Sequence, residues 1–153
     1  MNHESPLATG AGIAGIVMVF LIVFAIFLIP YIFYLLTLQK AFNRCAPENR
    51  ALAPGLVWLL LIPLFNLVWH FLVVINLAKS LEAEFQKRGI AEEPKPGQTI
   101  GMVMCILNAC SIIPFLGILC SLVALVCWII YWVKIAGFSG KIASPAAPAV
   151  APV

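Results

Sequence analysis

Three long windows of this 153-residue sequence contain no charged side chain, and they constrain the fold more than any other feature. They run from Ala11 to Gln39, from Ala51 to Ala78 and from Thr99 to Val133. An apolar window of about 18 residues or more without charge is typical of a membrane-spanning helix. The composition agrees, because only 10% of the residues are charged, against about a quarter in soluble domains. The sequence therefore predicts an all-α, integral membrane helical bundle.

The first window predicts one long N-terminal transmembrane helix over about residues 11–37, which continues toward Cys45. Pro30 lies inside this helix and is expected to kink it, because proline has no N–H and clashes with the preceding turn. The apolar run is longer than the core of a signal peptide, and no positive residue precedes it. We therefore expect the segment to stay attached as a signal anchor.

The second window would be about 42 Å long as one helix, against roughly 30 Å of hydrocarbon. One interpretation is a single tilted span. The other is a hairpin over about residues 47–88 that turns at residues 63–66, with arms Pro47–Ile62 and Leu67–Arg88. The hairpin is favoured because, with the N-terminus outside, it places all nine Lys and Arg on the cytoplasmic side.

The third window would be about 52 Å long as one helix, which is too long for one span. Pro114 and Gly117 are the natural turn residues, as Pro63 is in the second window. They predict a second hairpin over about residues 99–137 that turns at residues 114–117, with arms Ile100–Ile113 and Ile118–Ile135. Residues 89–98 are then an exposed linker. We expect a single domain over residues 1–141, followed by a disordered Pro/Ala-rich tail over residues 142–153.

The end of the first hairpin carries residues that recur every four positions and form one apolar face. These residues are Leu77, Leu81 and Phe85. We expect this face to lie on lipid headgroups at the cytoplasmic interface. Glu84 is placed to pair with Lys87 and Arg88, and Gly89 is a suitable C-terminal stop.

Several chemistries find no support in the sequence. The chain has no Asp, and all six Glu lie outside the charge-free windows, so Glu82 and Glu84 are interpreted as solvated charge. The five cysteines show no CxxC spacing, and no Ser–His–acid set or phosphate-binding glycine loop is present. No basic-aromatic stripe indicates nucleic acid. We therefore expect no catalytic residue, no cofactor, no metal and no nucleic-acid partner.

Four polar side chains inside the windows are the candidate functional residues. They are Asn66, His70, Asn76 and Asn108. Asn66 and His70 share a helix face, and their default role is to satisfy open backbone at the hairpin tip. The alternative is that the four line a polar cavity of a transporter. His70 as a haem ligand would require a second chain, because no other histidine lies in the windows.

The segments WLLLIPLFNLVWHFLVVINLAKSL and SIIPFLGILCSLVALVCWIIYWVKIAGFSGKI resemble uncharacterised small multi-pass bacterial membrane proteins. In those proteins an I-P-x-x-N or I-P-x-x-G turn joins two short helices. The resemblance covers about two thirds of the chain and depends mostly on apolar residues. It implies a helical bundle in a bacterial inner membrane and carries no activity or site.

These observations together predict a non-enzymatic protein that acts by association with the lipid bilayer, other membrane proteins or itself. It would be an accessory, scaffolding or bilayer-shaping protein. The alternative is a transport or lipid-handling protein that uses a polar cavity, as a single chain or as an oligomer. The predicted location is the bacterial inner membrane, with the N-terminus outside and the C-terminus cytoplasmic.

Overall fold

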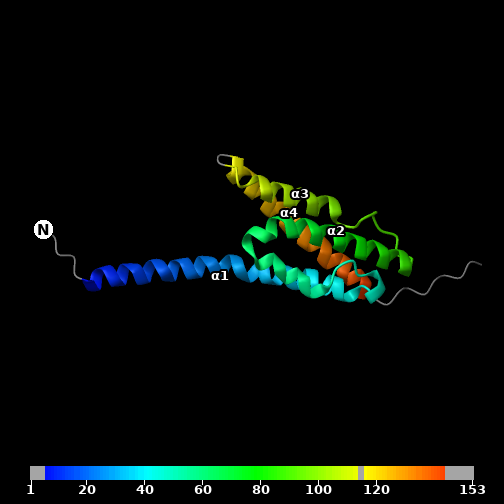
Figure 1. Ribbon diagram of the computed structural model, residues 1–153, viewed down its shortest axis with the longest axis horizontal. Helices are drawn as coiled ribbons and strands as arrows, with labels where there is room; N and C mark the ends of the chain where they lie inside the picture. The colour runs from blue at the N-terminus through cyan, green and yellow to red at the C-terminus, as the bar shows by residue number, and fades with distance from the viewer. Residues whose placement is uncertain (1–5, 114–115, 144–153) are drawn as a thin grey trace, which may run out of the picture. The chain divides into compact units, whose positions relative to one another are not determined.

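The computed structural model describes residues 6–113 and 116–143, and all regular structure in these residues is helical. In chain order the elements are α1 (Pro6–Arg44), η1 (Pro47–Asn49), η2 (Pro54–Leu61), α2 (Pro63–Arg88), α3 (Gln98–Cys110) and α4 (Leu116–Ala143) (Figure 1). The η elements are short 3₁₀-helices. Helices α1, α2 and α4 are each long and apolar enough to span a membrane. The predictions of an all-α fold and of several candidate spans are therefore confirmed.

The described chain divides into two compact units, of which the first ends at Tyr34 and the second begins at Leu35. The single domain over residues 1–141 stays a prediction. In the first unit, large apolar side chains are exposed on every side of α1. Examples are Ile16, Phe20 and Phe27. A helix that is apolar all round is found in a protein core or in a membrane, not in water. This unit therefore requires an apolar environment.

The second window reverses direction at Ile62. This residue is extended (φ −82°, ψ 113°) and separates η2 from α2. The two sides of the reversal lie next to each other, because the Trp69 indole donates a hydrogen bond to the Leu56 carbonyl at 2.8 Å. Further along, the Ala51 N–H donates to Ser80 Oγ at 2.9 Å. The window is therefore two adjacent arms and not one bent helix.

The turn was predicted at residues 63–66, but the reversal lies at Ile62, immediately before these residues. These residues form the first turn of α2, in which the Asn66 N–H donates to the Ile62 carbonyl at 2.8 Å. Pro63 is favourable there, since its fixed φ suits the first helical position and its missing N–H costs nothing. The apolar part of α2, residues 63–78, is therefore about 24 Å long. The preceding arm is not one α-helix but the short helices η1 and η2.

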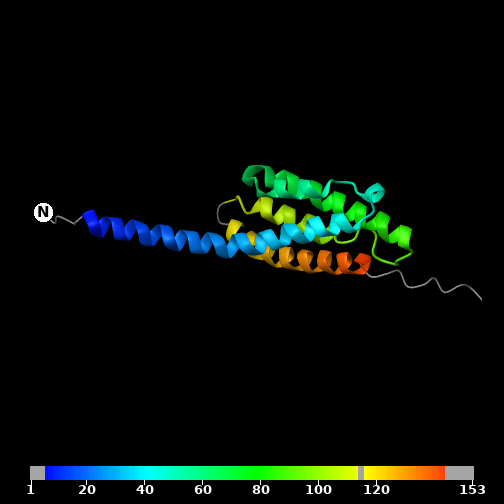
Figure 2. The ribbon, with the colours of Figure 1, turned by 90° about the horizontal axis from the view of Figure 1, so that it is seen from below.

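The third window also forms two adjacent helices, α3 and α4, which lie side by side in both views (Figures 1 and 2). Gly101 marks the point where both of them approach α2. A Cβ atom on Gly101 would stand 2.6 Å from Val74 Cγ1 and 2.8 Å from Tyr131 Cε2. Only a glycine permits this approach, so three helices meet at one position.

The helix ends in this region differ from the predicted arms. α3 begins at Gln98 after Gly97, which is left-handed (φ 73°), and ends at Cys110. Gly117 lies in the first turn of α4, where its N–H donates to the Ile113 carbonyl at 2.8 Å. Pro114 lies outside the described residues. α4 continues to Ala143, so the first two residues of the predicted tail are helical, and residues 144–153 lie outside the described part of the chain.

The apolar face of α2 packs inside the protein and not on lipid headgroups as predicted. Leu77, Leu81 and Phe85 are all buried. The Phe85 ring meets Phe138 of α4 edge to face, with centroids 5.8 Å apart. The last part of α1, from Leu35 to Arg44, belongs to the same unit and contributes buried residues such as Leu38 and Phe42.

Candidate functional site: the polar network at the charged end

The C-terminal ends of α2 and α4 and the chain that follows α1 gather at one end of the C-terminal unit (Figures 1 and 2). We call this region, comprising residues 40–50, 79–98 and 134–143, the charged end. Every Lys, Arg and Glu among the described residues falls within these ranges. The Ile62 reversal and the junction of α3 with α4 lie at the opposite end of the unit.

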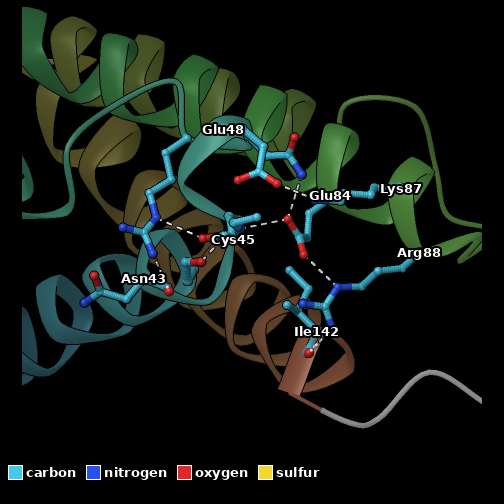
Figure 3. A network of polar contacts seen from close by, with 11 residues as sticks. Asn43, Cys45, Glu48, Glu84, Lys87, Arg88 and Ile142 are labelled. Carbon is cyan, nitrogen blue, oxygen red and sulfur yellow. Dashed lines mark hydrogen bonds and ion pairs between the residues drawn. The ribbon is translucent and has the colours of Figure 1, made fainter.

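Glu84 is the centre of the network and is only 2% exposed. Its Oε2 accepts hydrogen bonds from the Ala46 N–H at 2.9 Å and from Asn49 Nδ2 at 2.8 Å. Its Oε1 accepts from Arg88 Nε at 2.7 Å. Figure 3 shows the Glu84 side chain directed from α2 toward the segment around Cys45. The carboxylate therefore joins α2 to the chain that follows α1.

Two arginines hold the end of α4. Arg88 donates to the Ile142 carbonyl at 2.7 Å, as Figure 3 shows. Arg44 donates to the Ser139 carbonyl at 2.6 Å and to Ser139 Oγ at 2.9 Å. The last four carbonyls of a helix lack partners within the helix and carry the negative end of its dipole. The Ile142 carbonyl is one of these, and Ser139 lies just before them, so both guanidinium groups lie at the negative end of α4.

Arg50 acts in the same way on α1. Its Nε donates to the Cys45 carbonyl and its Nη2 to the Asn43 carbonyl, both at 2.9 Å. All three arginines of the chain thus bind main-chain carbonyls near helix C-terminal ends. The planar guanidinium has several donors in fixed directions, which a lysine ammonium does not provide.

Three of the lysines form ion pairs with glutamates and, within the described part of the chain, do not bind main-chain carbonyls. Lys87 pairs with Glu48, Lys134 with Glu93 at 2.7 Å, and Lys141 with Glu92. The hydrogen bond from Lys134 lowers the pKa of Glu93, and the one from Lys87 lowers the pKa of Glu48. These pairs are largely exposed and therefore weak. Two of them attach the linker between α2 and α3 to α4, and its last residues, Pro96 and Gly97, are buried, so the linker is not exposed throughout as predicted.

The four candidate polar residues lie on two helices, with Asn66, His70 and Asn76 on α2 and Asn108 on α3. His70 is buried, Asn66 lies one turn before it, and Asn108 is exposed on α3. Asn76 lies about 120° around α2 from His70. Its side-chain amide donates to the Leu72 carbonyl of its own helix at 2.8 Å.

Sequence reasoning missed the role of Glu84, which is buried rather than solvated. It pairs with Arg88 as predicted, whereas Lys87 pairs with Glu48 instead. The signal was available in the spacing: Glu84 lies seven residues after Leu77 and three after Leu81, on the apolar face of α2. A charged residue inside an apolar stripe indicates a buried partner.

The network holds elements together, and the thiol nearest to it is protonated and buried. Cys45, the thiol nearest to it, is buried and donates to the Ala41 carbonyl at 3.4 Å. Burial raises the pKa of Cys45 to about 11, so the reactive thiolate is scarce at neutral pH. Within residues 6–113 and 116–143, no group of three His, Cys, Asp or Glu side chains is arranged to hold a metal.

Comparison of the chain with family models, curated proteins and solved structures finds no match in any of the three. The function is therefore inferred from the geometry alone.

Proposed function

We propose that this chain is a multi-pass integral membrane protein whose two reversals enter the bilayer from the same face. It acts by association, as an accessory, scaffolding or bilayer-shaping protein, and not as an enzyme. The observation that carries this proposal is the separation of charge from apolar surface in the C-terminal unit. All its charged side chains lie at one end, and both reversals lie at the other.

The apolar surface outside the charged end supports burial in lipid. Large apolar side chains on α2 and α4 point outward, including Leu64, Val68, Ile118 and Leu122. A soluble protein rarely exposes a contiguous apolar surface of this extent. A hydrocarbon environment removes that cost, since these side chains are then surrounded by acyl chains.

The orientation follows from the basic residues. All nine Lys and Arg lie at the charged end, and such residues are concentrated on the cytoplasmic side of membrane proteins. The proposal therefore places the charged end and the C-terminus in the cytoplasm, the N-terminus outside, and the protein in a bacterial inner membrane.

Association is favoured over transport because the four polar side chains differ in burial and in partner. A solute pathway needs polar groups facing a common cavity. Asn76 instead bonds to its own helix, and His70 is buried whereas Asn108 is exposed. The most polar constellation, around Glu84, connects backbone segments.

Cysteine accessibility tests the topology. Ser5→Cys and Ala91→Cys are labelled in intact cells with a membrane-impermeant maleimide, each compared with the parent chain. We expect Ser5→Cys to react from outside, and Ala91→Cys to react only after permeabilisation. Labelling of residue 91 from outside contradicts entry of both reversals from the cytoplasm.

Reconstitution tests the functional class. The full chain is incorporated into phospholipid vesicles at increasing protein-to-lipid ratios, and vesicle size and protein cross-links are measured. Changed vesicle curvature identifies bilayer shaping, and concentration-dependent cross-links identify scaffolding. Saturable flux of small solutes would contradict the proposal and favour the transport alternative.

A further inference from the structure

Among the described residues, three of the six lysines form an ion pair with a glutamate and three do not. Lys87, Lys134 and Lys141 each pair with a glutamate at the charged end. Lys40 and Lys79 are exposed, and no carboxylate among the described residues lies within 4.0 Å of either ammonium. Lys95 is in the linker, away from the apolar windows.

Lys40 and Lys79 occupy equivalent positions relative to the apolar surface. Each is the first charged residue after a charge-free window. Lys79 shares a face of α2 with Leu72 and Val68, which lie seven and eleven residues earlier and are exposed. Lys40 follows the exposed Leu36 by one turn of α1. Each ammonium therefore lies where an outward-facing apolar stripe ends.

The net positive charge of the charged end favours a negatively charged partner. Nine basic and five acidic side chains lie there, and the glutamates that form ion pairs are engaged by Arg88 and by the other lysines. An ammonium at the edge of a lipid-facing stripe extends to the phosphate layer of the bilayer. The excess positive charge favours lipids with a net negative headgroup.

We propose that Lys40 and Lys79 each provide an interaction surface for anionic phospholipid, which binds with its phosphate at the ammonium group and its acyl chains along the exposed stripe that ends there. The inference depends on the proposed membrane insertion and adds the class of lipid to it. It also gives a role to the two unpaired lysines that border exposed apolar stripes; Lys95, the third lysine unpaired among the described residues, lies in the linker.

The test measures lipid selectivity of the full chain in vesicles. The protein is reconstituted in phosphatidylcholine with increasing brominated phosphatidylglycerol, and quenching of tryptophan fluorescence gives the relative affinity for the two lipids. The test variant is Lys40→Gln/Lys79→Gln. The matched control, Lys87→Gln/Lys141→Gln, removes the same charge from lysines that are ion-paired.

We expect the parent chain and the control to prefer phosphatidylglycerol, and the test variant to lose about 25-fold of that preference, since each of the two lysines contributes about fivefold. Equal affinity for both lipids in the parent chain, or an equal loss in the control, overturns the inference. Resistance to alkaline extraction is measured in parallel. Protein that resists extraction but shows no lipid preference refutes only the lysine surface, whereas extractable protein refutes the proposed function.

Discussion

The Glu84 carboxylate accepts a hydrogen bond from the main-chain N–H of Ala46, 38 residues earlier in the sequence, at 2.9 Å. Through the same carboxylate, Asn49 and Arg88 are drawn to one point. Since Arg88 also bonds to Ile142, a single buried acid links α2 to the chain after α1 and to the end of α4. Removal of this carboxylate should therefore loosen all three segments at once.

Glu84→Ala should lower the free energy of unfolding by about 2–4 kcal/mol, because it leaves the Ala46 N–H, the Asn49 amide and Arg88 Nε without an acceptor, although Arg88 keeps its bond to Ile142. Titration of the detergent-solubilised protein with SDS, followed by circular dichroism, measures the change. Glu48→Ala is the control, since that carboxylate is exposed and forms only a surface pair with Lys87. Equal stability of the parent and the Glu84 variant would mean that the network is not structural.

Arg44→Lys should cost about 1–2 kcal/mol, although the charge is kept, because one ammonium cannot reproduce the two bonds to Ser139. The same SDS titration measures it. The reverse change at a surface position, Lys79→Arg, serves as the control and should leave the midpoint unchanged. A lysine that fully replaces Arg44 would show that charge alone holds the end of α4.

Gly101→Ala should destabilise the protein by about 1–3 kcal/mol, because the added methyl overlaps Val74 and Tyr131. Gly140→Ala is the matched control: nothing lies within 4 Å of its Cβ position, and alanine favours a helix more than glycine does. The two unfolding midpoints should therefore move in opposite directions. A Gly101 variant as stable as the parent would mean that the three helices can separate at little cost.

Cys45 should react slowly with maleimide and do so in a pH-dependent way. Burial raises its pKa to about 11 from an ordinary value of 9.0, so at pH 8 the folded protein holds about a hundredfold less thiolate than an exposed thiol. The rate should rise with pH until it approaches 11. The thiol has a pKa near 9 in the unfolded chain and near 11 in the folded one. The stabilisation from burying the protonated Cys45 thiol is therefore complete below pH 9 and decreases as the pH rises above 9.

That experiment requires a chain in which Cys45 is the single cysteine, with the other four changed to alanine. Protein unfolded in SDS is the control and should react at the ordinary rate. A native rate equal to the unfolded rate at pH 8 would show that the thiol is accessible and ionised.

The helical class and the candidate spans could be predicted from the sequence, because runs of apolar residues without charge are a local signal. The reversal near Pro63 was also visible, since proline and asparagine interrupt such a run. Its position was misjudged by a few residues because proline is as well suited to the first position of a helix as to a turn.

The polar network could not be predicted in the same way, because its partners are distant in sequence. Arg44 and Ser139 are separated by 95 positions, and nothing near either residue indicates the other. Glu84 was the exception, since its place on the apolar face of α2 was a local sign of burial. The burial of His70 and the exposure of Asn108 depended on helix orientation, which composition does not report.

The bonds of Arg44 and Arg88 to α4 also set an order for biosynthesis. Their acceptors, Ser139 and Ile142, are among the last described residues that a ribosome adds. Until then, the two guanidinium groups lack these acceptors. A nascent chain halted before residue 139 therefore lacks the hydrogen bonds by which Arg44 and Arg88 hold the end of α4.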